Sequence, residues 1–170
     1  MVRRTSGGGT IFTDKGQLIY GLVTGKNLGK DIEGSFKEMC TVIIDALSSF
    51  GIESGYKPPN DIILNGKKIS GNALIMRDKA VLMHGTLIRE LDSQLMSQVL
   101  KDRKPGHVSS IKAECGFAPA MDDLKDAIRM SFEKRVGVEL VSGQLTDFEH
   151  TEIERLIKER YGCDEWNYKR

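Results

Sequence analysis

Cysteine is scarce in this sequence, and the few cysteines present are scattered. Cys40, Cys115 and Cys163 form no Cys-x-x-Cys pair and have no histidine at the spacing of a zinc ligand. This arrangement disfavours both a disulfide framework and a zinc site. Cys40 falls within an apolar helical pattern, so we expect it to pack in the core.

The sequence also lacks a long hydrophobic run and an excess of either charge. No stretch of about 18 apolar residues occurs, and the first residues contain no apolar signal region. We therefore expect a cytoplasmic protein that does not span a membrane. The 25 basic and 24 acidic residues nearly cancel, giving a net charge of +1. Proteins that bind nucleic acid usually carry a clear basic excess, so this balance argues against a nucleic-acid partner.

The residues that are present are typical of a folded domain, which we expect to span residues 1–170. Period-two and apolar runs predict strands at residues 10–13, 17–24, 62–64, 67–76 and 80–88. Helical periodicity predicts helices at residues 31–50, 92–100, 121–135 and 146–161, with loops at 25–30 and 101–106. Strands that come mostly before helices favour an α+β fold, in which a mostly antiparallel sheet packs with helices.

Three short signals mark where these elements begin or turn. Residues 14–16 (Asp-Lys-Gly) predict a hairpin that joins residues 10–13 to 17–24. Asn65-Gly66 predicts a type I′ turn between two strands. Thr146 followed by Glu149 predicts a capping box, in which each side chain binds a free backbone amide at the helix start.

Residues 3–9 (Arg-Arg-Thr-Ser-Gly-Gly-Gly) join a glycine run to two cations. Three successive glycines let backbone N–H groups approach an anion closely, and they permit positive φ. Arg3 and Arg4 can supply a guanidinium fork for phosphate or carboxylate. The alternative interpretation is a flexible terminal segment.

Residues 60–71 (Asn-Asp-Ile-Ile-Leu-Asn-Gly-Lys-Lys-Ile-Ser-Gly) form the more specific motif. Strict alternation would place Lys68 and Ser70 on one face of the sheet, and Lys67 and Ile69 on the other. The ammonium of Lys68 could then hold a carboxylate against a phosphate and stabilise the charge that develops there. A surface hairpin with solvated lysines is the alternative.

Four ordered motifs together resemble the lipoate–protein ligases of the biotin and lipoate ligase superfamily. The first is residues 3–14, from Arg-Arg-Thr-Ser-Gly-Gly-Gly to Asp, and the second is Asn-Asp at 60–61 with Gly-Lys-Lys-Ile-Ser-Gly-Asn-Ala at 66–73. The third is His-Gly-Thr-Leu at 84–87, and the fourth is the closing Tyr-x-x-x-x-Trp-Asn at 161–167. The resemblance covers nearly the whole chain and implies the α+β fold of the biotin and lipoate ligase catalytic domain.

The resemblance implies a two-step reaction. Lipoate and ATP give lipoyl-AMP and pyrophosphate, and the acyl group then passes to a lysine of a lipoyl domain, in a 2-oxoacid dehydrogenase complex or in the glycine cleavage H protein. Lys68 is the implied catalytic residue. Carried over by position, the ATP contacts are Arg4, Gly9, Thr10, Ile11, Phe12 and Lys68, and the lipoate contacts are Gly7, Gly8, Lys68, Ser70, Gly71 and His84.

Two of these positions have an alternative interpretation. Asp61 is the candidate for Mg²⁺ or for α-phosphate geometry, but a buried Asx turn before the strand would use the same residue. His84 could equally be a half-buried strand residue with a structural role.

The sequence departs from the family pattern in several places. Thr13 stands where the family has a histidine, and Met83 stands where it has the first histidine of a pair. The glycine loop begins at residue 3, where the family has a substantial preceding segment, so we expect a catalytic domain truncated at its N-terminus. We also expect a chain without the accessory C-terminal domain of longer ligases. Archaeal-type systems keep that domain on a separate protein, so an accessory ligase subunit is an expected partner.

Other functions stay open at the level of sequence. Residues 57–61 (Lys-Pro-Pro-Asn-Asp) also resemble a biotin ligase segment, although the glycine loop differs from the pattern of those enzymes. An octanoyl or lipoyl transferase would carry the acyl group on a thiolate, but residues 53–56, where related transferases have it, contain no cysteine. An alternative of another class is an incomplete or non-catalytic subunit that binds lipoyl domains or a partner ligase chain.

Overall fold

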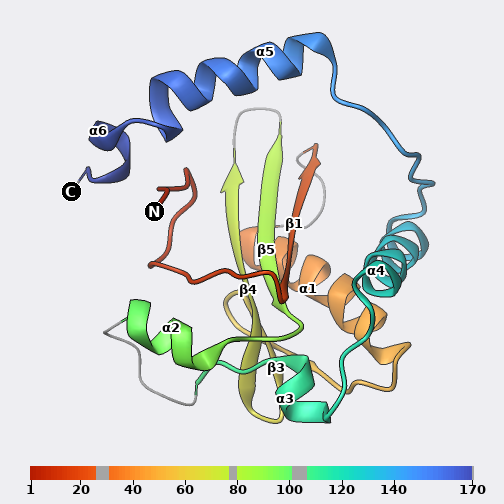
Figure 1. Cartoon of the computed structure of the whole chain (residues 1–170). Coiled ribbons are helices and arrows are strands. Elements are labelled where there is room, and N and C mark those ends of the chain that lie inside the picture. The colour runs from red at the N-terminus through yellow and green to blue at the C-terminus, as the bar shows by residue number, and fades with distance from the viewer. Residues whose placement is uncertain (26–30, 77–79, 101–106, 170) are drawn as a thin grey trace. The chain divides into compact units, whose positions relative to one another are not determined.

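The computed structural model of the chain describes residues 1–25, 31–76, 80–100 and 107–169 (Figure 1). Its internal contacts divide it into two compact units. The first unit combines Met1–Gly7 with Glu139–Arg170, and the second is Gly8–Val138. The expectation of one domain over residues 1–170 stays a prediction.

The second unit is built on a five-stranded antiparallel sheet with the strand order β1-β5-β4-β3-β2. The strands are β1 (Gln17–Thr24), β2 (Gly55–Lys57), β3 (Asp61–Leu64), β4 (Lys67–Met76) and β5 (Val81–Ile88). The predicted α+β class with a mostly antiparallel sheet is confirmed. The short edge strand β2 had no sequence signal, since Pro58 and Pro59 follow it directly.

The predicted hairpin between residues 10–13 and 17–24 is wrong. Residues 10–13 form no strand, and β1 pairs with β5, so that Gln17 lies opposite Ile88. The chain does turn at residues 15–16, where the Glu90 N–H donates to the Gly16 carbonyl oxygen at 2.9 Å. Strand β5 is the better partner because its buried side chains give β1 an apolar neighbour, whereas residues 10–13 are mostly exposed.

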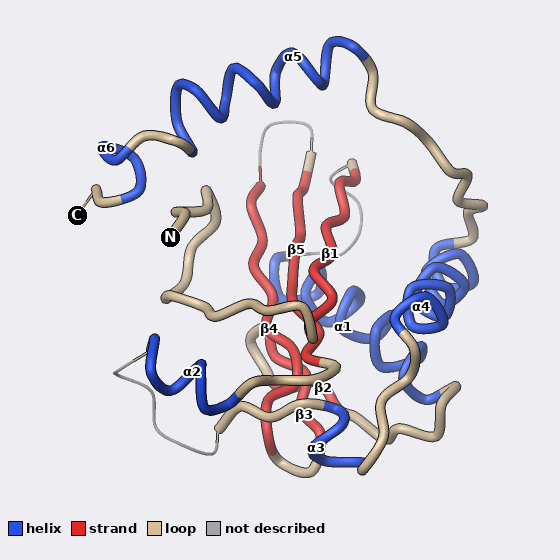
Figure 2. The backbone as a smooth tube through the Cα atoms, in the orientation of Figure 1, coloured by secondary structure: helices blue, strands red, loops and turns tan. Residues whose placement is uncertain are grey.

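Helices α1 (Ile32–Ser48) and α4 (Met121–Val136) pack on one face of this sheet (Figure 2). The helices predicted at residues 31–50 and 121–135 are thus confirmed. Asp31 caps α1 by accepting the Gly34 N–H at 2.6 Å, which satisfies one of the free amides at the helix start. The core between α1 and the sheet contains Cys40, Ile43, Leu47, Ile52, Ile62, Leu64, Ile69 and Leu87. The predicted burial of Cys40 is confirmed.

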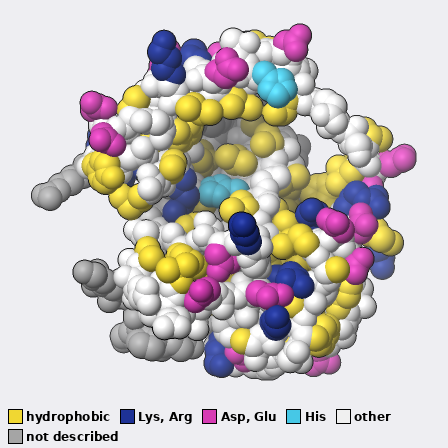
Figure 3. Space-filling model, in the orientation of Figure 1, with side chains coloured by type: hydrophobic (Ala, Val, Ile, Leu, Met, Phe, Trp, Pro, Cys, Tyr) yellow, Lys and Arg dark blue, Asp and Glu magenta, His cyan; other side chains and the backbone are white. Residues whose placement is uncertain are grey.

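The outer side of α4 is charged and solvent-exposed, which explains its weak apolar pattern. Basic and acidic side chains intermingle there (Figure 3). Arg129 pairs with Glu133 at 3.1 Å and Lys125 with Asp122 at 2.8 Å. Such i,i+3 and i,i+4 pairs support an exposed helix face and carry no strong net field.

Two short helices complete the second unit. Helix α2 (Ser93–Val99) matches the predicted helix at 92–100, and Asp92 caps it by accepting the Leu95 N–H at 2.8 Å. Helix α3 (Ile111–Cys115) was not predicted. The predicted loops at 25–30 and 101–106 lie, apart from Gly25, outside the described residues.

The first unit holds the end of the chain. Helix α5 (Asp147–Leu156) continues into a π-helical turn, η1 (Ile157–Tyr161), and a short helix α6 (Asp164–Asn167) follows. The predicted helix at 146–161 is confirmed. So is its capping box, because Glu149 N–H donates to Thr146 Oγ1 at 3.2 Å while the Thr146 N–H donates to Glu149 Oε2 at 2.8 Å.

Candidate active site

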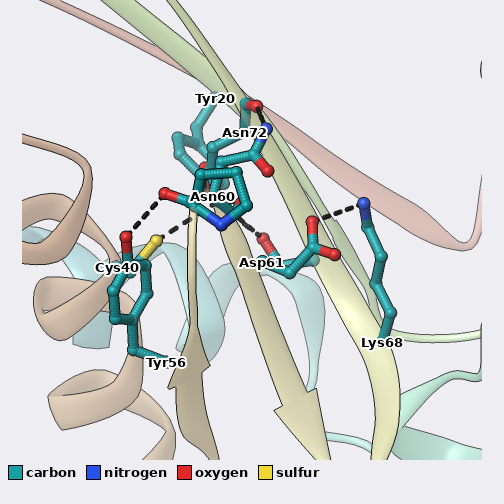
Figure 4. Close-up of polar contacts among 9 residues, drawn as sticks. Tyr20, Cys40, Tyr56, Asn60, Asp61, Lys68 and Asn72 are labelled. Atoms are coloured by element: carbon teal, nitrogen blue, oxygen red, sulfur yellow. Dashed lines mark hydrogen bonds and ion pairs between the residues drawn. The ribbon is translucent and has the colours of Figure 1, made fainter. Parts of the chain in front are cut away.

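Lys68 and Asp61 form an ion pair where β3 and β4 lie side by side (Figure 4). Lys68 Nζ lies 2.5 Å from Asp61 Oδ1, and the two side chains are 33% and 23% exposed. The pair is therefore within reach of solvent and of a ligand, yet partly shielded. A cation held in this way can bind a carboxylate or a phosphate as a compact point charge.

The predicted alternation along β4 is wrong, because a β-bulge interrupts it. The turn itself is the predicted type I′, with φ of 50° at Asn65 and 78° at Gly66. Past the turn, Lys68 lies opposite Ile63, whereas Ser70 lies opposite Ile62. One residue of β4 is thus extra between these two pairs, so the side chains beyond it change face.

Lys68 consequently shares its face with Gly71 and not with Ser70. A Cβ atom at Gly71 would lie 2.7 Å from both Cε and Nζ of Lys68, and 3.7 Å from Asp61 Oδ1. The lysine side chain therefore lies directly over the backbone of Gly71, in space that only a glycine leaves open. A glycine at position 71 is therefore explained by the space that the Lys68 side chain occupies and not by a positive φ.

Small residues extend from Lys68 along this face of the sheet, which is opposite to the helices. Gly71 lies opposite Thr86, and Ala73 lies opposite His84. His84 in turn lies opposite Gly21 on β1. The structure thus places His84 on the same face as Lys68, opposite the residue two positions beyond Gly71 along β4. Small side chains beside a charged end are suited to an elongated ligand with a carboxylate at one end.

Ser70 faces the helices instead. Its side chain is fully buried, and its hydroxyl lies 3.5 Å from the Tyr20 hydroxyl and 3.5 Å from Asn72 Nδ2. The lipoate contact expected of Ser70 stays a prediction. The position of Ser70 does not support it, because its hydroxyl lies on the face of the sheet opposite to Lys68.

Behind β4 lies a buried group of polar side chains that sequence reasoning missed. Asn72 Nδ2 donates to the backbone oxygen of Asn60 at 3.0 Å and to Cys40 Sγ at 3.4 Å. The Tyr20 hydroxyl donates to Asn72 Oδ1. Burial raises the pKa of Cys40 to about 12, with the nearby Asp61 carboxylate adding to the effect. Burial likewise raises the pKa of Tyr20, so both groups stay protonated at neutral pH.

The two arginines of the glycine loop belong to the first unit. Arg4 Nε donates to Ser6 Oγ at 3.0 Å, and its Nη2 donates to the Gly7 carbonyl oxygen at 2.9 Å. The loop is thus folded around its own guanidinium. The Arg3 backbone is bound on both sides, since its N–H donates to Asn167 Oδ1 at 2.9 Å and its oxygen accepts from Trp166 Nε1 at 2.8 Å.

The closing Tyr-x-x-x-x-Trp-Asn motif therefore has a visible structural role. Asn167 is buried, and its Nδ2 donates to the Tyr161 oxygen at 2.9 Å. The Tyr161 and Trp166 rings meet edge to face at 6.2 Å, and the Arg160 guanidinium lies 4.8 Å from the Trp166 ring centre. These contacts hold the backbone that immediately precedes Arg4.

The rest of the predicted ATP-binding stretch lies in the second unit. Gly8, a predicted lipoate contact, lies in this unit too and adopts a φ of 105°, a conformation that residues with a side chain rarely reach. Gly9 has no other atom within 4 Å of where a Cβ would lie. Thr10, Ile11 and Phe12 follow in an irregular segment that leads into β1. A glycine-rich segment of this kind lets a ligand approach the backbone closely.

The described residues do not form a protein-held metal site. Among them, no three His, Cys, Asp or Glu side chains gather as a metal would require. Asp61 offers a single carboxylate, which is paired with Lys68. Because Mg²⁺ is commonly bound by one or two carboxylates together with substrate phosphates, Asp61 fits an ion that arrives with a nucleotide.

Residues 1–133 match the family described as the lipoyl protein ligase A/B catalytic domain. The chain belongs to this family. Among its relatives, lipoate-protein ligase LplJ of Bacillus subtilis is 30% identical over 182 residues, which cover all of this chain and 54% of LplJ. Octanoyltransferase LipM of Bacillus cereus is 26% identical over 206 residues, which cover 99% of this chain and 74% of LipM. The chain thus spans about half of a ligase of this family and about three quarters of a transferase.

Solved structures of the family share the fold. A lipoate protein ligase of Thermoplasma acidophilum with bound lipoic acid superposes with a TM-score of 0.87 at 25% identity, over 98% of this chain and 70% of that one. A lipoate-protein ligase A bound with ATP gives 0.87 at 24% identity, over the same shares of the two chains. A bipartite lipoate protein ligase of T. acidophilum, solved as part of an archaeal lipoylation system with its E2 lipoyl domain, gives 0.87 at 24% identity, over 98% and 69%.

No helix in the described part of the chain has both the length and the apolarity of a membrane span.

Proposed function

We propose that this chain carries the adenylation chemistry of a lipoate–protein ligase. In the first step a lipoate carboxylate oxygen attacks the α-phosphorus of ATP, and pyrophosphate leaves with the electron pair of the broken P–O bond. In the second step the ε-amine of an acceptor lysine attacks the acyl carbonyl. An amide forms, AMP leaves, and the amine loses a proton to solvent.

The observation that carries this proposal is the position of Lys68. Its ammonium lies over Gly71, beside Asp61, at the charged end of a face floored by Gly71, Ala73 and Gly21. A lipoate carboxylate bound there would replace Asp61 as the partner of Lys68. Its acyl chain would then run along the small residues towards His84. The same ammonium would oppose the negative charge that grows on the phosphate in the transition state.

We propose that ATP binds at the glycine loop and brings Mg²⁺ with it. We assign the ATP contacts to Arg4 and to Gly9, Thr10, Ile11 and Phe12, since a glycine-rich segment can bind phosphates through its backbone, and a guanidinium can do so through its N–H fork. The relative solved with ATP supports a nucleotide substrate. Mg²⁺ would neutralise phosphate charge when it arrives with ATP, and Asp61 is the carboxylate available to it.

The acceptor we propose is the lysine of a lipoyl domain. The relative solved in an archaeal lipoylation system acts with an E2 lipoyl domain and is bipartite. An accessory ligase subunit is therefore a second proposed partner. Lipoate is the proposed acid because a relative with the same fold was solved with lipoic acid bound.

Octanoyl transfer is the second candidate, because LipM is about as similar to this chain as the ligases are. A transferase of this kind needs a thiolate near the bound acyl group. Cys40 is buried behind the sheet with its pKa raised to about 12, and Cys115 packs against the core. Neither cysteine of the second unit shares the face of Lys68, which favours ATP-driven ligation.

A non-catalytic or incomplete subunit is the candidate of another class. Edge strand β1 exposes Ile19 and Val23, which are 62% and 68% accessible and lie on the same face as Gly21. An uncharged strand edge with apolar side chains is a site where another chain could pair. Concentration-dependent association that Val23→Lys abolishes, in a chain without adenylation activity, would favour this candidate.

Lys68→Ala tests the proposed function directly. We expect it to lower the rate of lipoyl-AMP formation, followed by mass spectrometry, by at least about 100-fold. We expect little change in the melting temperature, because a partly exposed ion pair contributes about 0–1 kcal/mol. Lys67→Ala is the matched control, since Lys67 neighbours Lys68 but pairs with Glu114 at 2.8 Å. Equal rates for the two variants would remove Lys68 from the mechanism.

A further inference from the structure

We propose that Tyr20, Gly85 and Asn72 form a buried positioning row that fixes Asp61 and, through it, the ammonium of Lys68. The catalytic part of this inference rests on the proposed function. The three residues touch neither Lys68 nor the face on which it lies. They act from the other side of the sheet, through the backbone at the start of β3.

The row is set by the register of three neighbouring strands. Tyr20 of β1 lies opposite Gly85 of β5, and Gly85 lies opposite Asn72 of β4. Residues paired in this way share one face of a sheet. The Tyr20 side chain therefore crosses the central strand at a glycine and reaches Asn72 on the next strand but one, where its hydroxyl donates to Oδ1.

Gly85 is what makes this crossing possible. A Cβ atom at position 85 would lie 2.5 Å from the Tyr20 hydroxyl oxygen and 2.7 Å from Tyr20 Cζ. Any side chain there would displace either the phenol or the Asn72 amide. The glycine of the His-Gly-Thr-Leu motif thus serves the buried face of the sheet, while its neighbour His84 serves the other face.

Asn72 ties β4 to the residue before Asp61. The backbone oxygen of Asn60 accepts two N–H groups of Asn72, one from the backbone at 3.0 Å and one from Nδ2 at 3.0 Å. Asn60 Nδ2 donates in return to the Asn72 backbone oxygen. These reciprocal bonds fix the backbone on which Asp61 begins strand β3 (Figure 4).

The Tyr20 hydroxyl sets the orientation of the Asn72 amide. Asn72 is only 5% exposed, so a flipped amide would leave buried polar groups without partners, which is costly. With Oδ1 bound to the phenol, Nδ2 points to the Asn60 oxygen and to Cys40 Sγ. The bulge in β4 places Lys68 on the opposite face, where Asp61 of β3 also lies, and the two side chains pair at 2.5 Å.

Competitive acetylation of lysines tests the row without relying on catalysis. The full chain is treated with a trace of an N-hydroxysuccinimide ester of acetate, and the modification of Lys68 relative to Lys67 is measured by fragmentation mass spectrometry. Lys67 is the internal reference because its partner, Glu114, lies outside the row. Asp61→Asn, which removes the partner of Lys68, sets the upper limit of the ratio.

In Asn72→Ala we expect the ratio of Lys68 to Lys67 acetylation to rise about threefold, because the partly exposed ion pair between Lys68 and Asp61 would be lost. Asn72→Asp keeps an acceptor for Tyr20 but loses the donor to Asn60, so it should behave like Asn72→Ala. Tyr20→Phe should give a smaller rise. Leu124→Ala, which creates a cavity at a fully buried position of α4, is the control for loss of stability alone. An unchanged ratio in Asn72→Ala, or an equal rise in Leu124→Ala, would overturn the inference.

Kinetics of lipoyl-AMP formation distinguish a failure of the positioning role from a failure of the proposed function. Asn72→Ala should lower kcat about 10- to 100-fold, as expected for a displaced catalytic group, and leave KM for lipoate nearly unchanged. If the unmodified chain forms no adenylate with any acid, the proposed function fails, and the acetylation ratio still decides whether the row positions Lys68. If kcat and the ratio in Asn72→Ala both match those of Leu124→Ala, the row has only a stabilising role.

Discussion

At the scale of single residues, the candidate site depends on side chains that glycines leave room for. Lys68 lies over Gly71, and Tyr20 passes over Gly85. Neither glycine has a positive φ, so each is explained by space and not by backbone conformation. We therefore expect that one added methyl group at Gly71 or Gly85 is enough to move the Lys68 or the Tyr20 side chain.

Gly71→Ala should therefore impair adenylation while the fold persists. Its Cβ would lie 2.7 Å from the end of the Lys68 side chain, which is flexible and can move aside. We expect a loss of about 10- to 100-fold in the rate of lipoyl-AMP formation. Gly55→Ala, in the edge strand β2, is the matched control, because no described atom lies within 4 Å of where its Cβ would be. Full activity in Gly71→Ala would show that the position of Lys68 over Gly71 does not matter.

The buried thiol of Cys40 makes a prediction about alkaline stability. Its pKa is about 12 in the folded chain against 9.0 for a free thiol, so between these values unfolding releases a proton. The unfolded state then binds fewer protons, and the free energy of unfolding falls as pH rises. Tyr20, whose pKa is also raised, adds to this trend above pH 10.

We expect Cys40→Ser to lose less stability than the unmodified chain between pH 8.5 and pH 10.5, measured by urea unfolding at each pH. The slope that one such group can contribute is at most about 1.4 kcal/mol per pH unit. Identical slopes for the two proteins would contradict the assignment of a buried, protonated thiol. Tyr20→Phe, examined in the same way, separates the contribution of the phenol.

At the scale of elements, the sequence signals that succeeded are local. The Asn65-Gly66 turn and the Thr146–Glu149 capping box each involve residues within four positions of one another. Their chemistry is complete in the sequence itself. Helix α1 was predictable for the same reason, since its apolar positions repeat along one face.

The failures come from interactions between distant segments. The bulge in β4 changes which side chains accompany Lys68, and nothing in the alternation of residues 67–73 marks it. The pairing of β1 with β5, rather than with residues 10–13, depends on burial against a strand about 60 residues away. The Tyr20–Asn72 contact could have been suspected only from Gly85, and only once the strand order was known.

The closing Trp-Asn motif makes a prediction for the first unit. Asn167 accepts the Arg3 N–H and donates to the Tyr161 oxygen, so it ties the start of the chain to its last helix. Asn167→Ala should speed hydrogen exchange of the Arg3 amide markedly, while the amides of β4 and β5 keep their protection. Glu165→Ala, a change at the exposed neighbour of Trp166, is the control. Unchanged exchange at Arg3 would mean that this contact is not formed in solution.

At the scale of the whole molecule, the chain contains both groups of residues that the family resemblance assigns to the site. The first unit carries Arg4 and the contacts that hold its backbone, and the second carries Lys68, Asp61 and the face of small residues. Family membership and fold are established by the match over residues 1–133 and by the shared architecture. The choice between ligation and acyl transfer rests on chemistry at the site, since Cys40 is buried on the helix side of the sheet and Cys115 packs against the core.

Lipoate-dependent exchange between pyrophosphate and ATP distinguishes ATP-driven adenylation from acyl transfer. It is measured on this chain alone, with octanoate and biotin as comparison acids, and in parallel with acyl transfer from an octanoylated carrier protein. We expect exchange that requires lipoate or octanoate, disappears in Lys68→Ala and persists in Cys40→Ser. Transfer from the carrier without ATP, or a folded chain that exchanges pyrophosphate with none of the three acids, would contradict this expectation.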